Sequence, residues 1–407
     1  MINLTKKPEL LAPVGDMERL TSALDFGADA VYLAGKSFGM RSAPSNFSNE
    51  ELKEAVNTAH ARGVKVYVTC NILPHNHELA DLPDFLMYCQ EIGVDAFIMT
   101  DFGVMSMAKR YAPKVPVHIS TQAGVVNYET ANAFYNLGAE RVVLARELSF
   151  AEISEIRAKT PKELEIEAFV HGAMCVSFSG RCLLSNYLTG RDANHGDCAQ
   201  PCRWDYYLIE RTRPDQPFVI QEDQKSTYIM NSKDMCLIRH IPELIECGIS
   251  SFKIEGRAKS AYYVACATNA YRNAIDITCA GNPLPDWVIE ETERISHRAY
   301  STGFYSGYEP GQTTESAGYI RKWDVGAVCV GEENGYIKLT QRNRFFRGET
   351  VSVLEPGHEP YDLVLDEIFN ENMEPIDVAP HATMTVYLKS NKKISKGAYL
   401  RVRRENT

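Results

Sequence analysis

Short apolar runs alternate with amphipathic segments from residue 8 to about 276. Each run is almost entirely apolar and β-branched up to its last residues, which is typical of parallel strands buried on both faces. The segments between the runs have helical periodicity, and several begin at a capping residue or end at a glycine. We therefore expect eight strands, at ELLAPVG (9–15), AVYLAG (30–35), KVYVTCN (65–71), AFIMTD (96–101), VHISTQ (117–122), RVVLAREL (141–148), IEAFVHG (166–172) and SFKIEGR (251–257).

Strand and helix units in series predict an α/β fold of the (β/α)8 TIM-like barrel type, with a doubly wound open sheet as the alternative. Polar residues at the carboxyl ends of the predicted strands favour the barrel, because a barrel has its active site on that face. These residues are Asn71, Asp101, Gln122, Arg146, His171, Glu255 and Arg257.

The alternation of predicted strands and helices is interrupted in two places. After the seventh predicted strand there is an insertion at about residues 173–230, far longer than an ordinary βα loop. After residue 310 the pattern changes to short β runs separated by turns, which predicts a small β-barrel. We therefore expect a catalytic barrel domain at 1–310 that carries the insertion, and a C-terminal small β-barrel domain at 311–407.

Composition narrows the class of protein. The chain has 407 residues and a net charge of −10, which argues against a protein that coats nucleic acid non-specifically, because phosphate binding needs a basic surface. The first residues do not resemble a signal peptide, and the apolar runs are too short to span a bilayer. We therefore expect a cytoplasmic protein, where clustered cysteines more often bind metal or do chemistry than form disulfides.

The insertion carries four of the 11 cysteines, Cys175, Cys182, Cys198 and Cys202, with the spacing C-x6-C-x15-C-x3-C. Thiolates are soft ligands that suit a tetrahedral zinc ion or an iron–sulfur cluster. Structural zinc usually takes C-x2–4-C pairs, and the first pair here is too wide for that pattern. An iron–sulfur cluster is therefore favoured, with zinc and incidental loop cysteines as the alternatives.

The stretch EAFVHGAMCVSFSGRCLLS (167–185) resembles the signature of the collagenase-like peptidase family, catalogued as unassigned peptidase family 32. PELLAPVG, GADAVYLAG, NILPHN, STQA, YIMNSKDM and FKIEGRAKSAYYV also look like landmarks of this family, so the resemblance covers nearly the whole chain. Together with the C-terminal domain, they look most like the branch of prephenate-dependent tRNA uridine hydroxylases.

The resemblance implies an oxygen-independent hydroxylation of tRNA in the anticodon loop. In that reaction prephenate supplies the oxygen atom, an iron–sulfur cluster of the 4Fe-4S type assists, and the wobble uridine becomes 5-hydroxyuridine. It also implies cluster ligands at Cys175, Cys182 and Cys198, and it leaves open whether a partner protein of the same family is needed. Some members take the fourth ligand from a position near Asn231 here, so we expect Cys202 in that role, with Cys236 as the alternative.

The remaining candidate residues follow from chemistry. Prephenate has two carboxylates, and arginine pairs with a carboxylate through two parallel hydrogen bonds. We expect substrate binding by Arg41, Arg146, Arg181 and Arg257, and contact with the uracil edge by Asn71 and Gln122. Catalytic roles are assigned to His171, Glu167, Lys253 and Glu255, with a structural histidine as the alternative for His171.

Two other functions stay open. The family's name suggests a peptidase, which would need a nucleophile with a base, such as Cys175 with His171. A non-catalytic RNA-binding protein is the third hypothesis. In either RNA-related case, we expect basic residues of the C-terminal domain to bind tRNA phosphates, with a solvated charged face as the alternative. These are Arg342, Arg344, Arg347, Lys389, Lys392, Lys393, Lys396, Arg401, Arg403 and Arg404.

Overall fold

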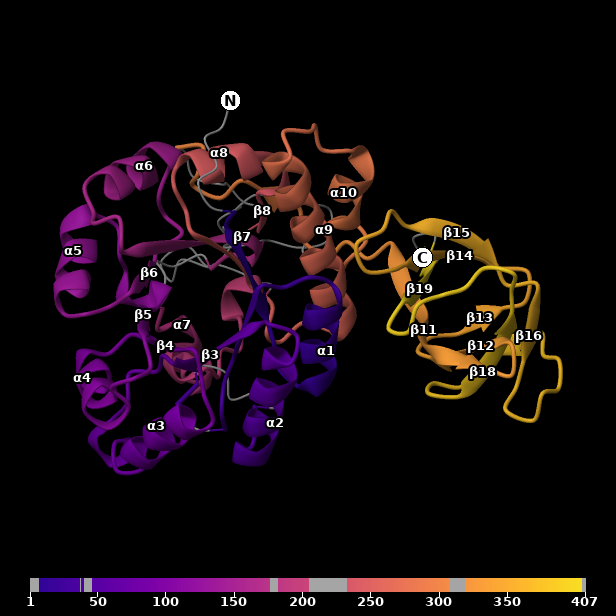
Figure 1. The fold of residues 1–407 in the computed structure, drawn as a ribbon, viewed down its shortest axis with the longest axis horizontal. Coiled ribbons are helices and arrows are strands. Elements are labelled where there is room, and N and C mark those ends of the chain that lie inside the picture. Colours follow the sequence, from indigo (N-terminus) through magenta and orange to yellow (C-terminus); the bar gives the residue numbers. More distant parts are fainter. Residues whose placement is uncertain are drawn as a thin grey trace, which may run out of the picture.

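The structure is a computed structural model, and it describes residues 7–36, 38–39, 46–175, 182–204, 233–307 and 319–404. Two of the predicted binding residues, Arg41 and Arg181, lie outside the described residues, as does Asn231. Figure 1 shows a large part built of strands and surrounding helices, with a smaller part made of strands beside it. No helix in the described part of the chain is long and apolar enough to cross a membrane.

Eight parallel strands form a closed barrel in the large part. The strands pair in chain order from β1 to β7; β9 then pairs in parallel with both β7 and β1, which closes the ring. This closure confirms the (β/α)8 barrel and excludes the open sheet. The strands, each at a predicted position, are β1 (Glu9–Pro13), β2 (Ala30–Leu33), β3 (Lys65–Cys70), β4 (Ala96–Met99), β5 (Val117–Ile119), β6 (Arg141–Val143), β7 (Glu165–Ala173) and β9 (Ser251–Ile254).

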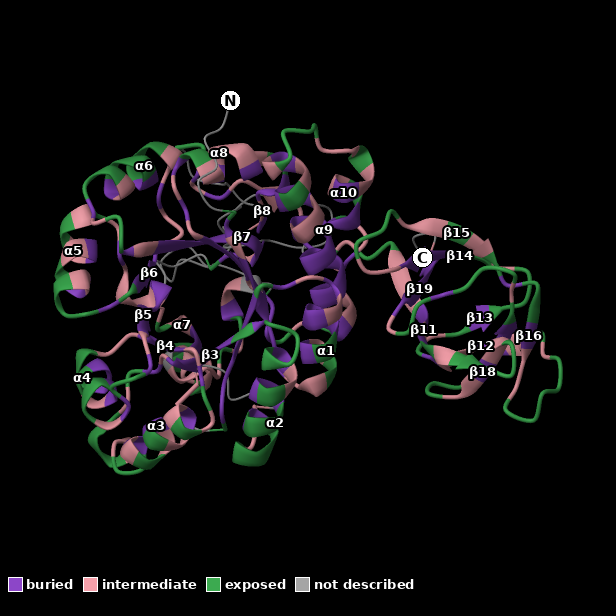
Figure 2. Cartoon of the chain, in the orientation of Figure 1, coloured by how far each residue is buried: buried purple, intermediate pink, exposed green. Residues whose placement is uncertain are grey.

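Helices cover the outside of the barrel and bury their apolar faces against it, as Figure 2 shows. A capping box is present at Ser48: its side chain accepts from the Glu51 backbone N–H, and the Glu51 carboxylate accepts from the Ser48 N–H. Asp101 caps α4 (Phe102–Tyr111) more simply, by accepting from the Val104 backbone N–H, which explains its place at a strand end. The helices are α1 (Met17–Asp25), α2 (Asn49–His60), α3 (Leu82–Glu91), α4 (Phe102–Tyr111), α5 (Tyr128–Asn136), α6 (Phe150–Ala158), α8 (Ile241–Glu246) and α9 (Ala261–Cys279).

The insertion begins where β7 extends beyond the barrel. Its described part contains α7 (Leu184–Thr189) and two short 3-10 turns, Ala193–His195 and Pro201–Arg203. The chain then returns as β8 (Asp234–Cys236), which runs antiparallel to the last residues of β7. After α9 come α10 (Asp286–Glu291) and β10 (Tyr300–Ser301), which pairs with β8.

The C-terminal domain is an antiparallel half-barrel with its own apolar core. Its main sheet has the order β15-β14-β19-β11-β12-β18-β16, and β13 pairs with β17. The strands are β11 (Trp323–Glu333), β12 (Tyr336–Gln341), β13 (Phe345–Phe346), β14 (Thr350–Leu354), β15 (Tyr361–Val364), β16 (Glu367–Phe369), β17 (Val378–Ala379), β18 (Thr385–Lys389) and β19 (Tyr399–Arg403).

A buried ion pair joins the two domains. Arg401 of β19 and Glu291 of α10 are both 0 % exposed, and the Arg401 Nη1 atom lies 2.7 Å from Glu291 Oε2. The expectation that Arg401 contacts tRNA phosphates is therefore wrong, because its buried guanidinium is paired with Glu291 between the two domains. Since removing one partner would leave the other charge buried and unpaired, the pair holds the half-barrel in place beside α9 and α10.

Candidate active site at the barrel mouth

Arg257 reaches across the carboxyl-end mouth of the barrel from β9 to β3. Its Nη1 atom donates to Thr69 Oγ1 at 3.0 Å, and its Nη2 atom donates to Asn46 Oδ1 at 2.9 Å. The residue is only 8 % exposed, so its guanidinium lies inside the mouth rather than on the outer surface. This is the position that a residue binding an anionic substrate in the barrel needs.

A second arginine lies between the ends of β6, β7 and β9. Arg146 donates through Nη1 to the Ala173 carbonyl at 2.7 Å, and its Nη2 atom is 3.5 Å from Glu255 Oε2. Its guanidinium carbon lies 4.0 Å from the centroid of the Phe169 ring. The sequence placed Arg146 and Glu255 at strand ends, and the structure brings them together as an ion pair.

Gly172 makes the close approach of β7 and β9 feasible. Its φ is +114°, and a Cβ atom there would lie 2.6 Å from the Glu255 carbonyl oxygen. A side chain at this position would therefore push Glu255, and with it Arg146, away from the mouth.

Two residues with amide side chains follow β3 and β5 at the mouth. The Thr100 hydroxyl, just after β4, lies 3.3 Å from both the backbone carbonyl oxygen of Asn71 and the side-chain Oε1 atom of Gln122. Asn71 and Gln122 are therefore close to one another, as their places at strand ends predicted. Amide groups offer both donors and acceptors, which is what the polar edge of a uracil requires.

His171 lies in a cage of tyrosines on the extension of β7. It is 1 % exposed, its Nδ1 atom is 3.5 Å from Tyr271 Oη, and its ring also contacts Tyr263 and Tyr300. Burial, with smaller effects of His297 and Lys259, lowers the pKa of His171 to about 3. The ring is therefore neutral at pH 7, which favours the structural alternative over a proton-transfer role.

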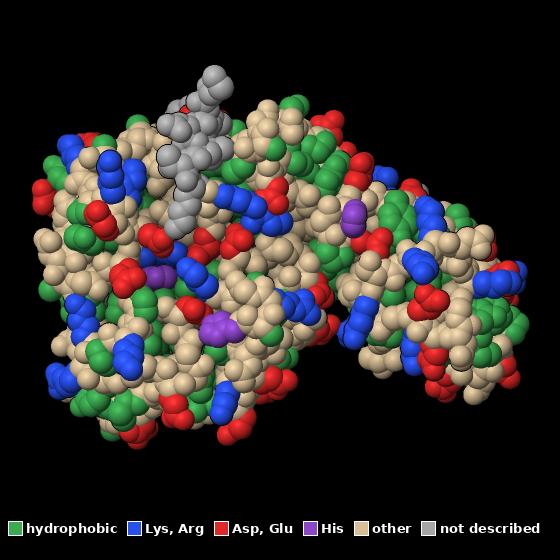
Figure 3. All heavy atoms as spheres, in the orientation of Figure 1, with side chains coloured by type: hydrophobic (Ala, Val, Ile, Leu, Met, Phe, Trp, Pro, Cys, Tyr) green, Lys and Arg blue, Asp and Glu red, His purple; other side chains and the backbone are tan. Residues whose placement is uncertain are grey.

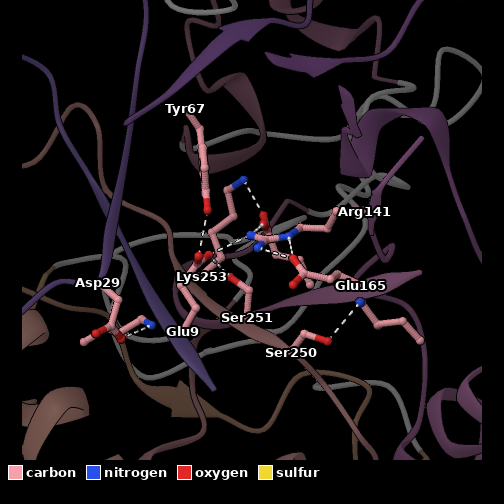
Figure 4. Close-up of polar contacts among 11 residues, drawn as sticks. Glu9, Asp29, Tyr67, Arg141, Glu165, Ser250, Ser251 and Lys253 are labelled. Carbon is pink, nitrogen blue, oxygen red and sulfur yellow. Dashed lines mark hydrogen bonds and ion pairs between the residues drawn. The ribbon is translucent and has the colours of Figure 1, made fainter. Parts of the chain in front are cut away.

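Glu167 and Lys253 lie deeper in the barrel, in a buried charge network shown in Figure 4. Lys253 Nζ is 2.7 Å from Glu167 Oε1, and Arg141 Nη1 is 3.0 Å from Glu167 Oε2 and 2.6 Å from Glu9 Oε1. Glu9, Arg141, Glu165 and Ser251 are the first residues of their strands, so the network lies toward the amino ends. The active sites of such barrels lie at the opposite, carboxyl-end face, so this position gives Glu167 and Lys253 a structural role.

The four cysteines of the insertion are all within the described residues, and none is deeply buried. No three His, Cys, Asp or Glu side chains of the described ranges are close enough to hold a metal ion, so the thiols are not gathered into a ligand set as they stand. Residues 176–181, which connect Cys175 to Cys182, lie outside those ranges. Cys198 Sγ accepts a hydrogen bond from the Gln200 backbone N–H at 3.3 Å.

Cys236, the alternative fourth ligand, is packed elsewhere. Its sulfur lies 3.8 Å from both Tyr271 Oη and Thr292 Oγ1, beside His171. Burial raises the pKa of the Cys236 thiol, which makes it a poorer ligand than a solvated thiol. The geometry therefore favours Cys202 over Cys236.

The insertion is tied to the rim of the mouth by a contact that the sequence did not signal. His195 stacks on His75 with ring centroids 5.6 Å apart, and its Nε2 atom lies 3.5 Å from Glu78 Oε2. His75 and Glu78 belong to the segment after β3, so the cysteine-bearing insertion lies at the mouth.

Many basic residues of the C-terminal domain have acidic partners. Figure 3 shows basic and acidic side chains interspersed over the displayed face of this domain. Besides the buried Arg401, four of the predicted phosphate-binding residues form ion pairs: Arg342 with Glu18, Arg347 with Asp377, Lys389 with Glu367 and Arg404 with Glu349. Such pairing reduces the positive potential that the sequence suggested for this domain.

Sequence comparisons with known proteins extend over most of the chain. Residues 15–315 match the sequence model of peptidase family U32, and residues 321–401 match that of the peptidase family U32 C-terminal domain. The chain is 40% identical over 399 residues to tRNA hydroxylation protein P1 of Bacillus subtilis, covering 96% of this chain and 94% of that protein.

Two Escherichia coli proteins are also similar. The chain is 36% identical over 429 residues to tRNA hydroxylation protein P, covering 94% of this chain and 93% of that protein. It is 34% identical over 328 residues to 23S rRNA 5-hydroxycytidine C2501 synthase, covering 78% of this chain and 46% of that longer protein.

Proposed function

Because this chain belongs to peptidase family U32, with relatives that are similar over almost its full length, we propose that it is an RNA hydroxylase. The similarity to two tRNA hydroxylation proteins over at least 93% of each carries the proposal. The rRNA 5-hydroxycytidine synthase supports the same type of reaction on another RNA. In its specific form, the proposal is that the wobble uridine of tRNA becomes 5-hydroxyuridine, with prephenate as the oxygen donor.

The barrel mouth offers the groups that this reaction needs. Arg257 and Arg146 present guanidinium groups on opposite sides of the mouth, where they suit the two carboxylates of prephenate. Asn71 and Gln122 lie close together and suit the polar edge of a uracil that has left its stack. The roles of these side chains are to bind and orient the two substrates so that the reacting atoms meet.

The proposal includes an iron–sulfur cluster because the insertion carries four cysteines that could be its ligands. Four thiols at the mouth are the donor set of a 4Fe-4S cluster, which would supply one-electron chemistry when bound. Their described positions do not form such a site, so we derive no catalytic step from it. Assembly would require the exposed Cys175 and Cys198 to approach Cys182 and Cys202.

The peptidase alternative receives no support from the residues that it would need. Cys175 and His171 form no hydrogen bond with each other, although both lie in the described part of the chain. His171 is enclosed by tyrosines, so it cannot take a proton from an exposed thiol without leaving its cage.

An in vitro reaction tests the proposal. Protein purified without oxygen is incubated with unmodified tRNA and prephenate, and the digested RNA is analysed by mass spectrometry. We expect the fragment with the wobble uridine to gain the mass of one oxygen atom, and a collagen-derived peptide to stay intact. Cleavage of the peptide with unchanged RNA would establish the peptidase instead, and binding of tRNA without any change in mass would establish the RNA-binding alternative.

Changing Arg257 to lysine tests prephenate binding at the mouth. Lysine keeps the charge but loses one of two parallel hydrogen bonds, which should cost about 1.5–3 kcal/mol of binding free energy. We expect the KM for prephenate to rise by about one to two orders of magnitude, while the KM for tRNA stays near its wild-type value. The matched control is Arg110→Lys on the exposed end of α4. An unchanged prephenate KM in a folded Arg257→Lys protein would assign Arg257 to structure alone.

A further inference from the structure

A groove of about 640 Å³ lies between the barrel and the C-terminal domain. On the barrel side it is formed by the start of α1 and by the loop that follows β9, and on the other side by Tyr319 and Trp323. The neighbouring α1 and α9 stand next to the half-barrel in Figure 1. Because Lys259 comes two residues after Arg257, the groove begins at the rim of the proposed active site.

The charges in this groove cancel except at one lysine. Its carboxylates each pair with an arginine, and these pairs are Asp16 with Arg19, Glu18 with Arg342 and Asp324 with Arg321. Lys259 makes no ion pair with any described residue. Its ammonium lies over two aromatic rings instead, 4.5 Å from the centroid of Tyr319 and 5.3 Å from that of Tyr263. Among the described residues that line the groove, Lys259 is therefore the one positive charge without an acidic partner, and it lies beside aromatic rings.

We infer that this groove binds one nucleotide of the RNA substrate, next to the nucleotide that enters the barrel mouth. This inference rests on the proposed function and names a binding site for that substrate outside the mouth. Tyr319 is 42% exposed, and its ring already attracts two cations, the Lys259 ammonium at 4.5 Å and the buried Arg298 guanidinium at 5.3 Å from its centroid. When Lys259 moves to neutralise the adjoining phosphate, it gives up its cation–π contacts with Tyr319 and Tyr263 and leaves the exposed part of the Tyr319 ring for a base to stack on.

The size and rigidity of the groove support a nucleotide as its occupant. Its volume lies within the range of pockets that hold small ligands. Its two walls belong to different domains, and the buried pair of Arg401 with Glu291 fixes the distance between them. A splayed RNA loop presents a base and a phosphate at each nucleotide. The base matches the Tyr319 ring, and the phosphate matches the Lys259 ammonium, which forms no ion pair with a described residue.

Binding of a labelled anticodon stem-loop RNA to the full-length protein tests the inference. We expect Tyr319→Ala to raise the Kd about tenfold through loss of stacking, and Tyr319→Phe to keep it within about twofold of wild type. Lys259→Gln should lower the slope of log Kd against log salt concentration by about 0.7, the value for one phosphate of a single strand. The matched control is Lys114→Gln, an exposed lysine before β5 at the opposite end of the barrel, which should change neither quantity.

Two results would overturn the inference, and they are distinguishable. If wild-type protein binds and hydroxylates the RNA, and Tyr319→Ala and Lys259→Gln bind it equally well, the groove has no part in RNA binding but the proposed function stands. If wild-type protein neither binds nor modifies the RNA, the proposed function fails as well.

Discussion

Replacing Arg141 with methionine is expected to lower the free energy of unfolding by about 3–5 kcal/mol. The side chain is 2 % exposed and bonds Glu9, Glu165 and Glu167 inside the barrel. Without Arg141 these carboxylates repel one another at close range, and the ion pair that remains among these residues is the one between Lys253 and Glu167. Urea denaturation at pH 7 measures the loss.

The same variant has an expected pH dependence. Burial alone would raise the pKa of Glu9, but the charge of Arg141 and the hydrogen bonds from Arg141, Tyr67 and Ser251 hold it below its usual value. In the wild type, Glu9 therefore contributes stability above its unfolded pKa of about 4.3, and this contribution is lost as the pH falls through the lower folded pKa. In the variant the effect of burial on Glu9 is no longer offset by Arg141, so its pKa is raised. Protonation of Glu9 then relieves its repulsion with the neighbouring carboxylates. The difference in stability should narrow as the pH falls from neutral toward about 3.

A matched exposed pair provides the control. Arg62→Met removes an ion pair with Asp25 on the surface and should change the free energy of unfolding by less than about 1 kcal/mol. If Arg141→Met were as mild as this control, or if its effect were the same at every pH, the network would not hold the barrel together in the way we describe.

Changing Cys182 to alanine is expected to abolish RNA hydroxylation and to remove bound iron and sulfide. The reason is that the variant keeps only three of the four thiolate ligands, and no other cysteine in the described insertion replaces the fourth. Cys175→Ala and Cys198→Ala should be equally severe. Iron and sulfide analysis of protein purified without oxygen, together with the hydroxylation assay, measures both effects.

The fourth ligand is tested by a comparison within the same series. Cys202→Ala should lose the cluster as Cys182→Ala does, whereas Cys236→Ala should keep it, because Cys236 packs against Tyr271 and Thr292. The reverse ranking would move the ligand to Cys236. Full iron content in the Cys182→Ala protein would contradict the cluster itself.

Much of the barrel could be predicted because buried parallel strands appear in the sequence as short runs of almost entirely apolar, β-branched residues. All of the predicted strands are present, and the capping box at Ser48 marks the start of its helix, since both signals are local. The expectation for Lys253 was less successful. Its place on a predicted strand is confirmed, but its depth along the barrel axis depends on the register with β7, where Phe169 lies opposite Lys253.

Long-range charge pairs could not be predicted from local patterns. Arg141 and Glu9 are 132 positions apart, and Arg401 and Glu291 are 110 apart. In the sequence Arg401 therefore looked like its basic neighbours on β19. At the mouth, Arg146, Glu255 and Arg257 could be placed at strand ends, but the contacts that orient them come from Ala173, Thr69 and Asn46, which only the closed barrel brings near.

The nucleoside content of tRNA from cells tests the central claim most directly. The gene is deleted from its host, tRNA is digested, and 5-hydroxyuridine and nucleosides derived from it are measured by mass spectrometry. The proposed function predicts that these nucleosides disappear in the deletion strain and return when the wild-type protein is supplied, but not when the Cys182→Ala protein is supplied. Unchanged amounts of 5-hydroxyuridine and of every other hydroxylated nucleoside in the deletion strain would contradict it.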